Sequence, residues 1–185
     1  MKNNELIARI APISREKWQG HEINFNYKSN NYYNVEITRT HDNFNVTFTK
    51  NPFDKPYIHK PTYPDKLFAH WLDDVMAWGI EDGDRLLAVI ETSVEEWNNR
   101  LRVTELWVDE AYKRKGIATE LMDIAIKRAE DEGRRVVVLE VQSCNEAAIA
   151  FYLAYGLTLI GFDACAYRND DISRKEVRLE MGFFL

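Results

Sequence analysis

The sequence contains only two cysteines, Cys144 and Cys165, and they do not form a CxxC pair. Two isolated thiols exclude a disulfide framework and a structural zinc site built on cysteine. We interpret both side chains as small apolar groups that fill the core. So few cysteines are typical of a reducing compartment, and we therefore expect a cytoplasmic location and no bound metal ion.

The sequence also lacks long hydrophobic runs and an excess of positive charge. No stretch approaches the roughly 18 consecutive apolar residues of a membrane span, and the first residues lack the apolar core of a secretory signal. With 30 acidic and 24 basic residues, the net charge at pH 7 is −6. An acidic chain suits a cationic small molecule better than a nucleic acid. We expect neither a membrane nor a nucleic acid as a partner.

The length of 185 residues favours one domain with a single hydrophobic core. We expect one domain over residues 1–185, in which 1–70 form an N-terminal elaboration and 71–185 form the core. Within the elaboration, two segments of alternating polarity, 32–40 and 44–49, predict a hairpin. Four prolines then predict that the chain has no regular structure up to residue 64: Pro52, Pro56, Pro61 and Pro64.

A second hairpin and a strand-helix-strand unit are predicted in the core. An Asp-Gly turn between residues 75–80 and 85–92 favours the hairpin. The elements expected after it are a strand over 101–108, an amphipathic helix over 119–128, an apolar strand over 135–142, a helix over 146–155 capped by Asn145, and two final strands over 157–166 and 175–183. Because the 135–142 strand is almost continuously apolar, we expect it to lie parallel to the 101–108 strand.

The segment from Lys113 to Thr119 is basic, contains Gly116 and joins the 101–108 strand to the helix. The first N–H groups of a helix lack intrahelical acceptors, and the helix dipole adds positive character there. A glycine lets a phosphate approach the backbone closely, so this turn predicts a phosphate site. By itself the turn also suits a nucleotide-binding protein. A nucleic-acid patch is the weaker alternative, because three basic residues in an acidic chain make a poor one.

The order of strand, basic glycine turn, helix, apolar strand and a short helix with Asn145 and Tyr152 resembles the GCN5-related N-acetyltransferase (GNAT) superfamily. That family binds the pyrophosphate of acetyl-coenzyme A at an (Arg/Gln)-x-x-Gly-x-(Gly/Ala) turn. The turn from Lys113 to Ala118 matches this pattern, with lysine at the first position. Lysine can still reach a phosphate as a point charge.

From Ala88 onward, over half of the chain, the sequence looks like the streptothricin (nourseothricin) acetyltransferases. The shared segments are Trp97 to Leu101, Leu139 to Asn145 and Gly161 to Tyr167. The resemblance implies an α/β (α+β) GNAT fold, in which a mixed, mostly antiparallel central sheet splays between its fourth and fifth core strands and is flanked by helices. It also implies an enzyme that transfers acetyl from acetyl-CoA to a primary amine on the β-lysine moiety of streptothricin and so confers resistance.

The resemblance implies two catalytic residues. Tyr152 is the expected general acid that protonates the departing thiolate, and the alternative is that it only packs in an aromatic stripe with neighbouring rings. Glu105 is the expected base, with Glu91 and Glu140 as other candidates. Relatives carry Glu-Asp where this chain has Thr104-Glu105, so the assignment of the base stays open, and a strand carboxylate can also simply face solvent.

The resemblance also assigns the binding residues. Those expected to hold acetyl-CoA are Leu106, Trp107, Val108, Lys113, Arg114, Lys115, Gly116, Ile117, Ala118, Thr119, Asn145 and Ala148, with a backbone N–H near Val108 as the oxyanion donor. Those expected to bind the cationic acceptor are Trp97, Asp163, Tyr167 and Glu91, with Asp73, Asp74 and Trp78 as further candidates. The alternative functions are a peptide or other small-amine N-acetyltransferase of the same fold and a non-catalytic acyl-CoA-binding regulator. A homodimer is compatible with each of them.

Overall fold

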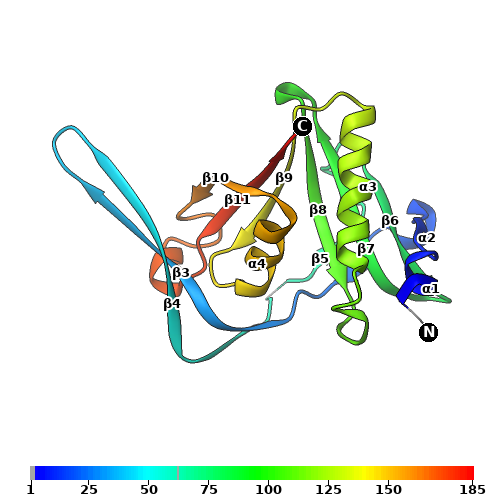
Figure 1. Ribbon diagram of the computed structural model, residues 1–185, viewed down its shortest axis with the longest axis horizontal. Helices are drawn as coiled ribbons and strands as arrows, with labels where there is room; N and C mark the ends of the chain where they lie inside the picture. The colour runs from blue at the N-terminus through cyan, green and yellow to red at the C-terminus, as the bar shows by residue number, and fades with distance from the viewer. Residues whose placement is uncertain (1–2, 62) are drawn as a thin grey trace. The chain divides into compact units, whose positions relative to one another are not determined.

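The structure is a computed structural model that describes residues 3–61 and 63–185 (Figure 1). The chain forms two compact units. The first contains the described parts of Met1–Phe25 and Thr62–Leu139 together with Phe183–Leu185, and the second contains Asn26–Pro61 and Glu140–Gly182. Across the described residues, no helix combines the length and the apolar character needed to cross a bilayer.

The first unit is a layered sheet covered by a long helix. Its helices are α1 (Asn3–Ile7), α2 (Arg15–Trp18), the short 3₁₀ turns η1 (Glu96–Asn98) and η2 (Glu110–Tyr112), and α3 (Ile117–Asp131). Its strands are β1 (Ala11–Pro12), β2 (Glu22–Ile23), β5 (Asp65–Lys66), β6 (Met76–Asp82), β7 (Arg85–Glu95), β8 (Arg100–Val108) and the first part of β9 (Val136–Gln142). The strand order is β1-β6-β7-β8-β9, and α3 packs along β6, β7 and β8 (Figure 1).

The predicted core elements of this unit are confirmed. β6 and β7 form the expected hairpin, with Asp82 paired to Arg85 across a two-residue turn. β8 follows antiparallel to β7, and β9 lies parallel to β8 after the α3 crossover. The sheet is therefore mixed and mostly antiparallel, with helices against it, as the resemblance implies.

The pairing between β8 and β9 is short. It runs from Arg100 opposite Val136 to Arg102 opposite Val138 and ends there. Beyond Arg102, β8 continues to Val108 and keeps its pairing with β7 on the other side. This is the splay between the two central strands that the resemblance implies.

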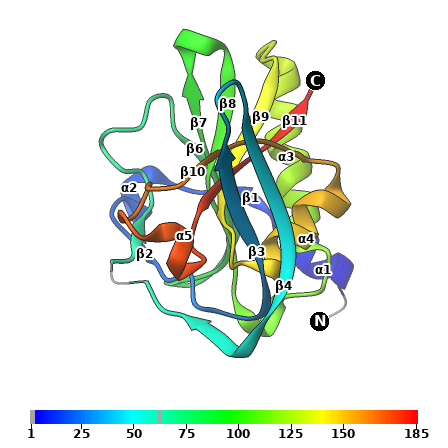
Figure 2. The same cartoon turned by 90° about the vertical axis from the view of Figure 1, so that its left-hand side faces the viewer.

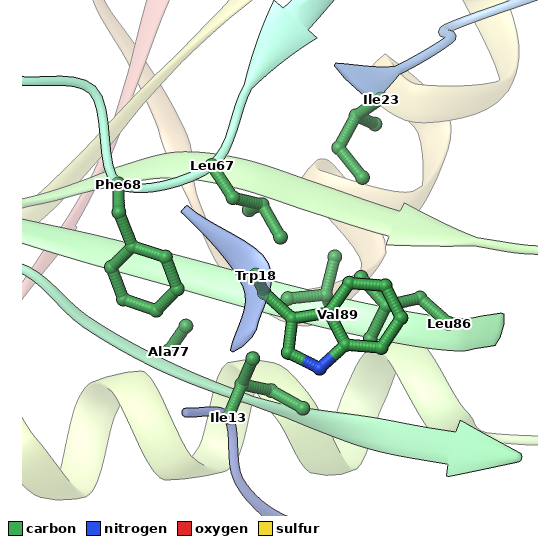
Figure 3. Close-up of a cluster of buried hydrophobic side chains, with 8 residues drawn as sticks. All are labelled: Ile13, Trp18, Ile23, Leu67, Phe68, Ala77, Leu86 and Val89. Atoms are coloured by element: carbon green, nitrogen blue, oxygen red, sulfur yellow. The ribbon is translucent and has the colours of Figure 1, made fainter. Parts of the chain in front are cut away.

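A hydrophobic cluster covers the face of β6 and β7 that is formed by alternate residues such as Ala77 and Val89 (Figure 3). Its other members are Ile13, Trp18, Ile23, Leu67, Phe68 and Leu86, and the side chain of Trp107 packs against it. Five of the eight buried members come from residues before β6. The N-terminal segments are thus part of the core of this unit.

Gly79 on β6 is required by the close approach of β7. A Cβ at this position would lie 2.2 Å from the Ala88 carbonyl oxygen and 3.1 Å from the Val89 Cα. Since both atoms belong to the backbone of the paired strand, they cannot move without loss of pairing. We expect Gly79→Ala to lower the free energy of unfolding in urea by about 2–4 kcal/mol.

The matched control is Gly161→Ala, where the nearest atom to the new Cβ is a side-chain oxygen of Glu180 at 3.7 Å. That contact is ordinary, and we expect a change below about 1 kcal/mol. Equal stability of the two variants would contradict the packing argument.

The second unit contains a long two-stranded ribbon, two helices and a strand pair. The ribbon strands are β3 (Tyr27–Arg39) and β4 (Phe44–His59), the helices are α4 (Glu146–Tyr155) and α5 (Asp171–Arg174), and β10 (Thr158–Asp163) pairs antiparallel with β11 (Arg178–Phe184) (Figure 2). α4 begins after Asn145 as predicted, and its cap is formed by the Asn145 side chain, which accepts the Ala148 N–H.

Several predictions for this unit are wrong at their boundaries. β4 continues through Pro52 and Pro56, where no regular structure is predicted. A two-stranded ribbon leaves one edge of each strand free, so a missing N–H is tolerated there, and the pairing skips from Tyr57 to Pro52 opposite Ser29 and Asn31.

The C-terminal strands are also shorter than predicted. β10 ends at Asp163, because its carboxylate accepts the Cys165 N–H at 2.9 Å and turns the chain. β11 begins at Arg178, since Lys175 before it has a φ of +65°. The segment between the two strands contains α5. Cys144 is buried as expected, but Cys165 is exposed and does not fill a core.

Candidate functional site

The turn that leads into α3 is exposed and ends in a helix N-terminus. The Asp109 side chain accepts the Ala111 N–H at 3.0 Å and starts η2, and Gly116 then caps α3 with a φ of +82°. Thr119 and Glu120 both donate their N–H groups to the Gly116 carbonyl, at 3.0 and 3.2 Å. The N–H groups of the residues before Thr119 lie in the first turn, where helix geometry offers no acceptor.

The three basic residues of this turn differ in their surroundings. The Lys113 ammonium donates to Glu110 at 2.6 Å. The Lys115 ammonium donates to the Ala111 carbonyl at 2.9 Å and lies over the Tyr112 ring. Arg114 is exposed and has a φ of +63°. The two lysines are thus bound to the protein itself, and Arg114 is the cation of this turn that remains for an anion.

The end of β8 supplies the predicted backbone groups. Leu106, Trp107 and Val108 pair with Ile90, Val89 and Ala88 of β7 in that order. On the opposite side, the β9 pairing has already ended at Arg102. This strand edge therefore has the geometry to pair with an extended ligand, whereas the Trp107 side chain belongs to the hydrophobic cluster.

Two carboxylates face each other across β7 and β8. Glu91 and Glu105 are direct partners in the antiparallel register, and a β-bulge follows, because Thr92 next pairs with Val103 and skips Thr104. Directly opposed residues have Cβ atoms about 4.5–5.5 Å apart and point to the same face. Glu91 is 0% and Glu105 is 9% exposed. The alternative of a solvent-facing strand carboxylate is therefore wrong for both.

The buried Glu91 carboxylate is held by two donors. The Phe68 N–H donates to it at 2.5 Å, and the Thr104 hydroxyl donates to its other oxygen at 2.8 Å. Burial raises the pKa of Glu91, while both hydrogen bonds oppose the shift. The pKa of Glu91 is higher in the folded chain than in the unfolded chain. The stability that this group contributes therefore falls as the pH rises from the unfolded pKa through the folded pKa.

The second unit carries the predicted general acid. Ile149 and Tyr152 form the buried side of α4, and the Tyr152 ring contacts the Phe151 ring at a centroid distance of 5.5 Å. The Asn145 oxygen accepts the Ala148 N–H at 3.3 Å. The cap role of Asn145 is thus confirmed, and the Ala148 N–H is used within the helix.

The start of α4 is fastened to the β3–β4 ribbon by contacts that the sequence does not signal. Glu146 accepts two hydrogen bonds from Asn31 at 2.9 Å and pairs with Lys50 at 2.6 Å. Tyr27 donates to Gln142 at 2.5 Å and lies 3.2 Å from the Cys144 thiol. Burial raises the pKa of that thiol to about 11, so it is a poor nucleophile at neutral pH.

Two predicted acceptor residues, Asp163 and Tyr167, lie in one polar network. The Tyr167 hydroxyl donates to Glu140 at 3.3 Å, and Arg178 contacts both Glu140 and Asp163 at 3.4 Å. Hydrogen bonding by the Cys165 N–H lowers the pKa of Asp163, whereas burial raises that of Tyr167. The structure therefore brings the two residues together and includes Glu140, the third candidate base, in the same exposed network.

The remaining predicted acceptor residues are scattered in the first unit. Trp97 is 85% exposed at the β7–β8 turn, with the Arg100 guanidinium over its ring. It lies in η1, beyond the end of β7, whereas Glu91 lies four residues before that end, about 13 Å along the strand. Trp78 follows Ala77 on β6, so its side chain lies on the sheet face opposite to the hydrophobic cluster. There it lines a groove with Ile7 and Ile124. Neither tryptophan joins the carboxylate pair.

The sequence does not signal the contact of the loop at Phe68 with a carboxylate. Phe68 adopts a φ of +55° and donates its N–H to Glu91, although no turn motif marks this position. Within the described residues, no three His, Cys, Asp or Glu side chains gather where they could hold a metal ion.

Comparison with known proteins gives the family. A model of the acetyltransferase (GNAT) family matches residues 41–157. A streptothricin acetyltransferase from Streptomyces lavendulae is 33% identical over 88 residues, which cover 48% of this chain and 46% of that protein. Streptothricin acetyltransferase A from Bacillus subtilis (strain 168) is 26% identical over 132 residues, which cover 66% of this chain and 71% of that protein. The chain thus matches only about half the length of the first relative.

Solved structures show the same fold. A nourseothricin acetyltransferase has a TM-score of 0.72 at 24% identity, with 95% of this chain and 97% of that chain covered. A protein from Bacillus anthracis str. Ames, solved in complex with acetyl coenzyme A, has a TM-score of 0.72 at 18% identity, with 95% and 98% covered. The match over residues 41–157 and the shared fold confirm the predicted membership: this chain belongs to the acetyltransferase (GNAT) family.

Proposed function

We propose that the chain is an acetyl-CoA-dependent N-acetyltransferase that acetylates a primary amine on the β-lysine moiety of streptothricin and thereby confers resistance. The observation that supports streptothricin as the acceptor is the similarity to two proteins that are both named streptothricin acetyltransferases. The acidic net charge of −6 supports a cationic acceptor, whose charge falls when an ammonium becomes an amide.

The turn before α3 supports acetyl-CoA as the donor. Its exposed helix N-terminus offers backbone N–H groups to a pyrophosphate, and Arg114 adds a positive charge. The free edge of β8 at Leu106 to Val108 would pair with the extended pantetheine arm. When bound, acetyl-CoA supplies the thioester that is cleaved.

The proposed reaction needs one base and one acid. Glu105 takes a proton from the acceptor ammonium, directly or through water. The neutral nitrogen then forms the new C–N bond at the thioester carbonyl, whose oxygen is stabilised by a backbone N–H near Val108. The C–S bond breaks, Tyr152 protonates the coenzyme A thiolate, and the second proton that the nitrogen loses as the amide forms passes through water to the Tyr152 phenolate. The high pKa of the Cys144 thiol favours this direct transfer over a cysteine acyl intermediate.

The test is release of free thiol when the purified protein, acetyl-CoA and streptothricin are mixed. We expect thiol release that depends on all three components, and a product that carries one acetyl group by mass spectrometry. Aminoglycosides, polyamines and a basic peptide serve as comparison acceptors. Turnover of the peptide alone would assign a peptide N-acetyltransferase, and binding of acetyl-CoA without turnover of any amine would indicate a regulator.

Arg114→Ala is expected to raise KM for acetyl-CoA by about tenfold and to leave kcat unchanged. The physical reason is loss of a charge-assisted hydrogen bond, which contributes about 1.5–3 kcal/mol before solvent screening. Steady-state kinetics with varied acetyl-CoA measure the effect. Lys127→Ala removes an exposed charge from α3, the helix that follows this turn, where Lys127 pairs with Asp131, and controls for net charge. An unchanged KM in Arg114→Ala would remove this residue from the donor site.

A further inference from the structure

The loop from Leu67 to Asp74 in the first unit is pinned to the sheet at its first residues. The Leu67 N–H donates to the His21 carbonyl at 3.1 Å, and the Leu67 carbonyl accepts the Gly20 N–H at 2.9 Å. The Phe68 N–H donates to the buried Glu91 carboxylate at 2.5 Å. Leu67 and Phe68 also lie in the hydrophobic cluster, so the start of the loop is fixed.

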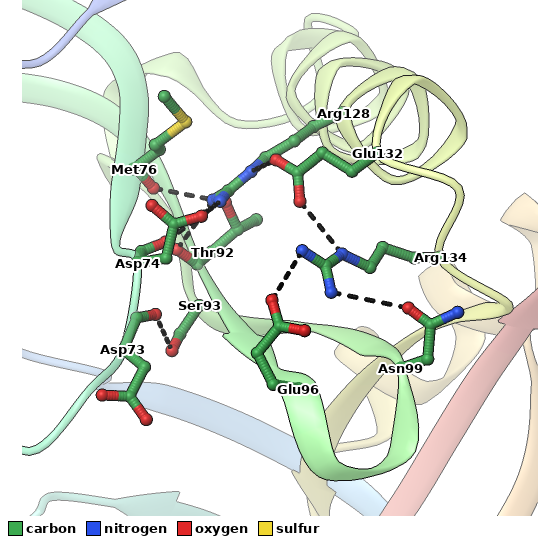
Figure 4. Close-up of polar contacts among 10 residues, drawn as sticks. All are labelled: Asp73, Asp74, Met76, Thr92, Ser93, Glu96, Asn99, Arg128, Glu132 and Arg134. Atoms are coloured by element: carbon green, nitrogen blue, oxygen red, sulfur yellow. Dashed lines mark hydrogen bonds and ion pairs between the residues drawn. The ribbon is translucent and has the colours of Figure 1, made fainter.

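The last residues of the loop are pinned as well. The Asp73 carbonyl accepts the Ser93 hydroxyl at 2.7 Å and the Val94 N–H at 3.1 Å. Asp74 accepts the Arg128 guanidinium at its carbonyl, at 3.0 Å, and at its carboxylate, at 2.7 Å. Figure 4 shows Arg128 reaching from α3 to Asp74, and Ser93 bonded to the backbone of Asp73.

Between these anchors the loop presents two aromatic side chains to solvent. Ala69 and Leu72 close a tight turn, since the Leu72 N–H donates to the Ala69 carbonyl at 3.2 Å. His70 and Trp71 are its two central residues, and their rings meet edge to face at 5.0 Å. Trp71 is 70% exposed. An exposed indole on a fixed turn is suited to binding, because little ordering is required when a ligand arrives.

Carboxylates lie on both sides of this turn, and the Arg15 guanidinium lies over the Phe68 ring at 5.7 Å. Trp71 is three residues from Phe68, so it lies within about 11 Å of the residue that contacts Glu91. Glu91 in turn faces Glu105. Asp73 is exposed on the other side of the turn, whereas the Asp74 carboxylate is neutralised by Arg128. An exposed aromatic face beside the exposed Asp73 carboxylate is the chemistry that recognises an organic cation.

We propose that Trp71 and Asp73 form a recognition site for a second positive charge of the acceptor, while a different amine of the same molecule reaches Glu105. The site selects acceptors with at least two cationic groups separated by a linker and gives no advantage to a monoamine. Trp71 stacks on the distal cation, and Asp73 pairs with it. This inference rests on the proposed function, because it takes Glu105 as the position of the reacting amine.

The experiment compares Trp71→Ala, Trp71→Phe and Asp73→Asn with the wild type. We expect Trp71→Ala to raise KM for streptothricin roughly tenfold at unchanged kcat, with the KM for acetyl-CoA unaffected. Trp71→Phe should restore most of the affinity, since a phenyl ring keeps an aromatic face. Asp73→Asn should raise KM and weaken the dependence of KM on salt. Phe44→Ala is the matched control, because Phe44 is a 74% exposed aromatic residue outside this loop.

Binding without turnover separates this inference from the proposed function. Calorimetric titration of the wild type and Trp71→Ala with streptothricin, spermidine and butylamine, in the absence of acetyl-CoA, should show loss of affinity for the two polycations only. An unchanged dissociation constant and KM for streptothricin in Trp71→Ala would overturn the inference and leave the function standing. If the wild type does not acetylate streptothricin, the proposed function fails, and the spermidine titration alone then decides for or against the cation site.

Discussion

Tyr152→Phe is expected to lower kcat for acetyl transfer by about 10²- to 10⁴-fold, because the departing thiolate then lacks its proton donor. The phenyl ring keeps the packing of a buried residue on α4, so the melting temperature should change little. The KM values for both substrates should stay within about twofold, since the hydroxyl acts on the chemical step and not on binding. Thiol-release kinetics and thermal melting measure the two quantities.

The control for this prediction is Tyr155→Phe, which removes a hydroxyl from the last residue of the same helix. Its ring centroid lies 6.2 Å from that of Phe151, so both tyrosines contact the same phenylalanine ring. We expect wild-type kinetics. If Tyr152→Phe also keeps its kcat, Tyr152 only packs against its neighbours and another group protonates coenzyme A.

Glu105→Gln is expected to lower kcat/KM for the acceptor by about 10²- to 10⁴-fold at pH 7. A lysine-type ammonium has a pKa of about 10.4, so only about one amine in 10³ is neutral at that pH without a base. The neutral fraction rises about tenfold for each pH unit up to the pKa. The activity of the variant should therefore recover steeply with pH, whereas that of the wild type should rise much less. A pH profile of kcat/KM from pH 6 to about 10 measures this.

Glu91→Gln tests which of the two opposed carboxylates, Glu91 or Glu105, acts as the base. The amide oxygen can still accept the Phe68 N–H, so the loop anchor remains while the charge is lost. Because burial raises the pKa of Glu91, loss of its ionised form should not destabilise the fold at neutral pH. We expect no recovery of activity with pH in this variant. If Glu91→Gln shows that recovery and Glu105→Gln does not, Glu91 is the base.

Local signals account for the elements that were predicted well. The apolar spacing predicts the α3 and α4 helices. Each helix begins next to its own cap residue, Gly116 for α3 and Asn145 for α4. The β6–β7 hairpin follows from its turn. The prediction fails at Pro52, because whether a missing N–H matters depends on the edge at which the strand lies.

The candidate site divides in the same way. The phosphate turn was predicted as a unit, but the structure alone distinguishes Arg114 from the two lysines, which bind Glu110 and the Ala111 carbonyl. The resemblance implies Glu105 as the base, but it does not imply that Glu105 pairs with Glu91. That pairing depends on the register and on the bulge at Thr104, which no single segment encodes.

The sequence by itself determined the order of elements, the position of the glycine turn for which a phosphate site is predicted, the family and the acidic net charge. Only the tertiary structure decided which carboxylates are buried, which basic side chains of the turn have partners within the protein, and that the loop before Trp71 is bonded to Glu91 through the Phe68 N–H. The physical reason is the separation along the chain of the residues that interact. Caps, turns and helical spacing arise from neighbours along the chain, whereas burial and strand register arise from residues that meet only when the whole unit has folded.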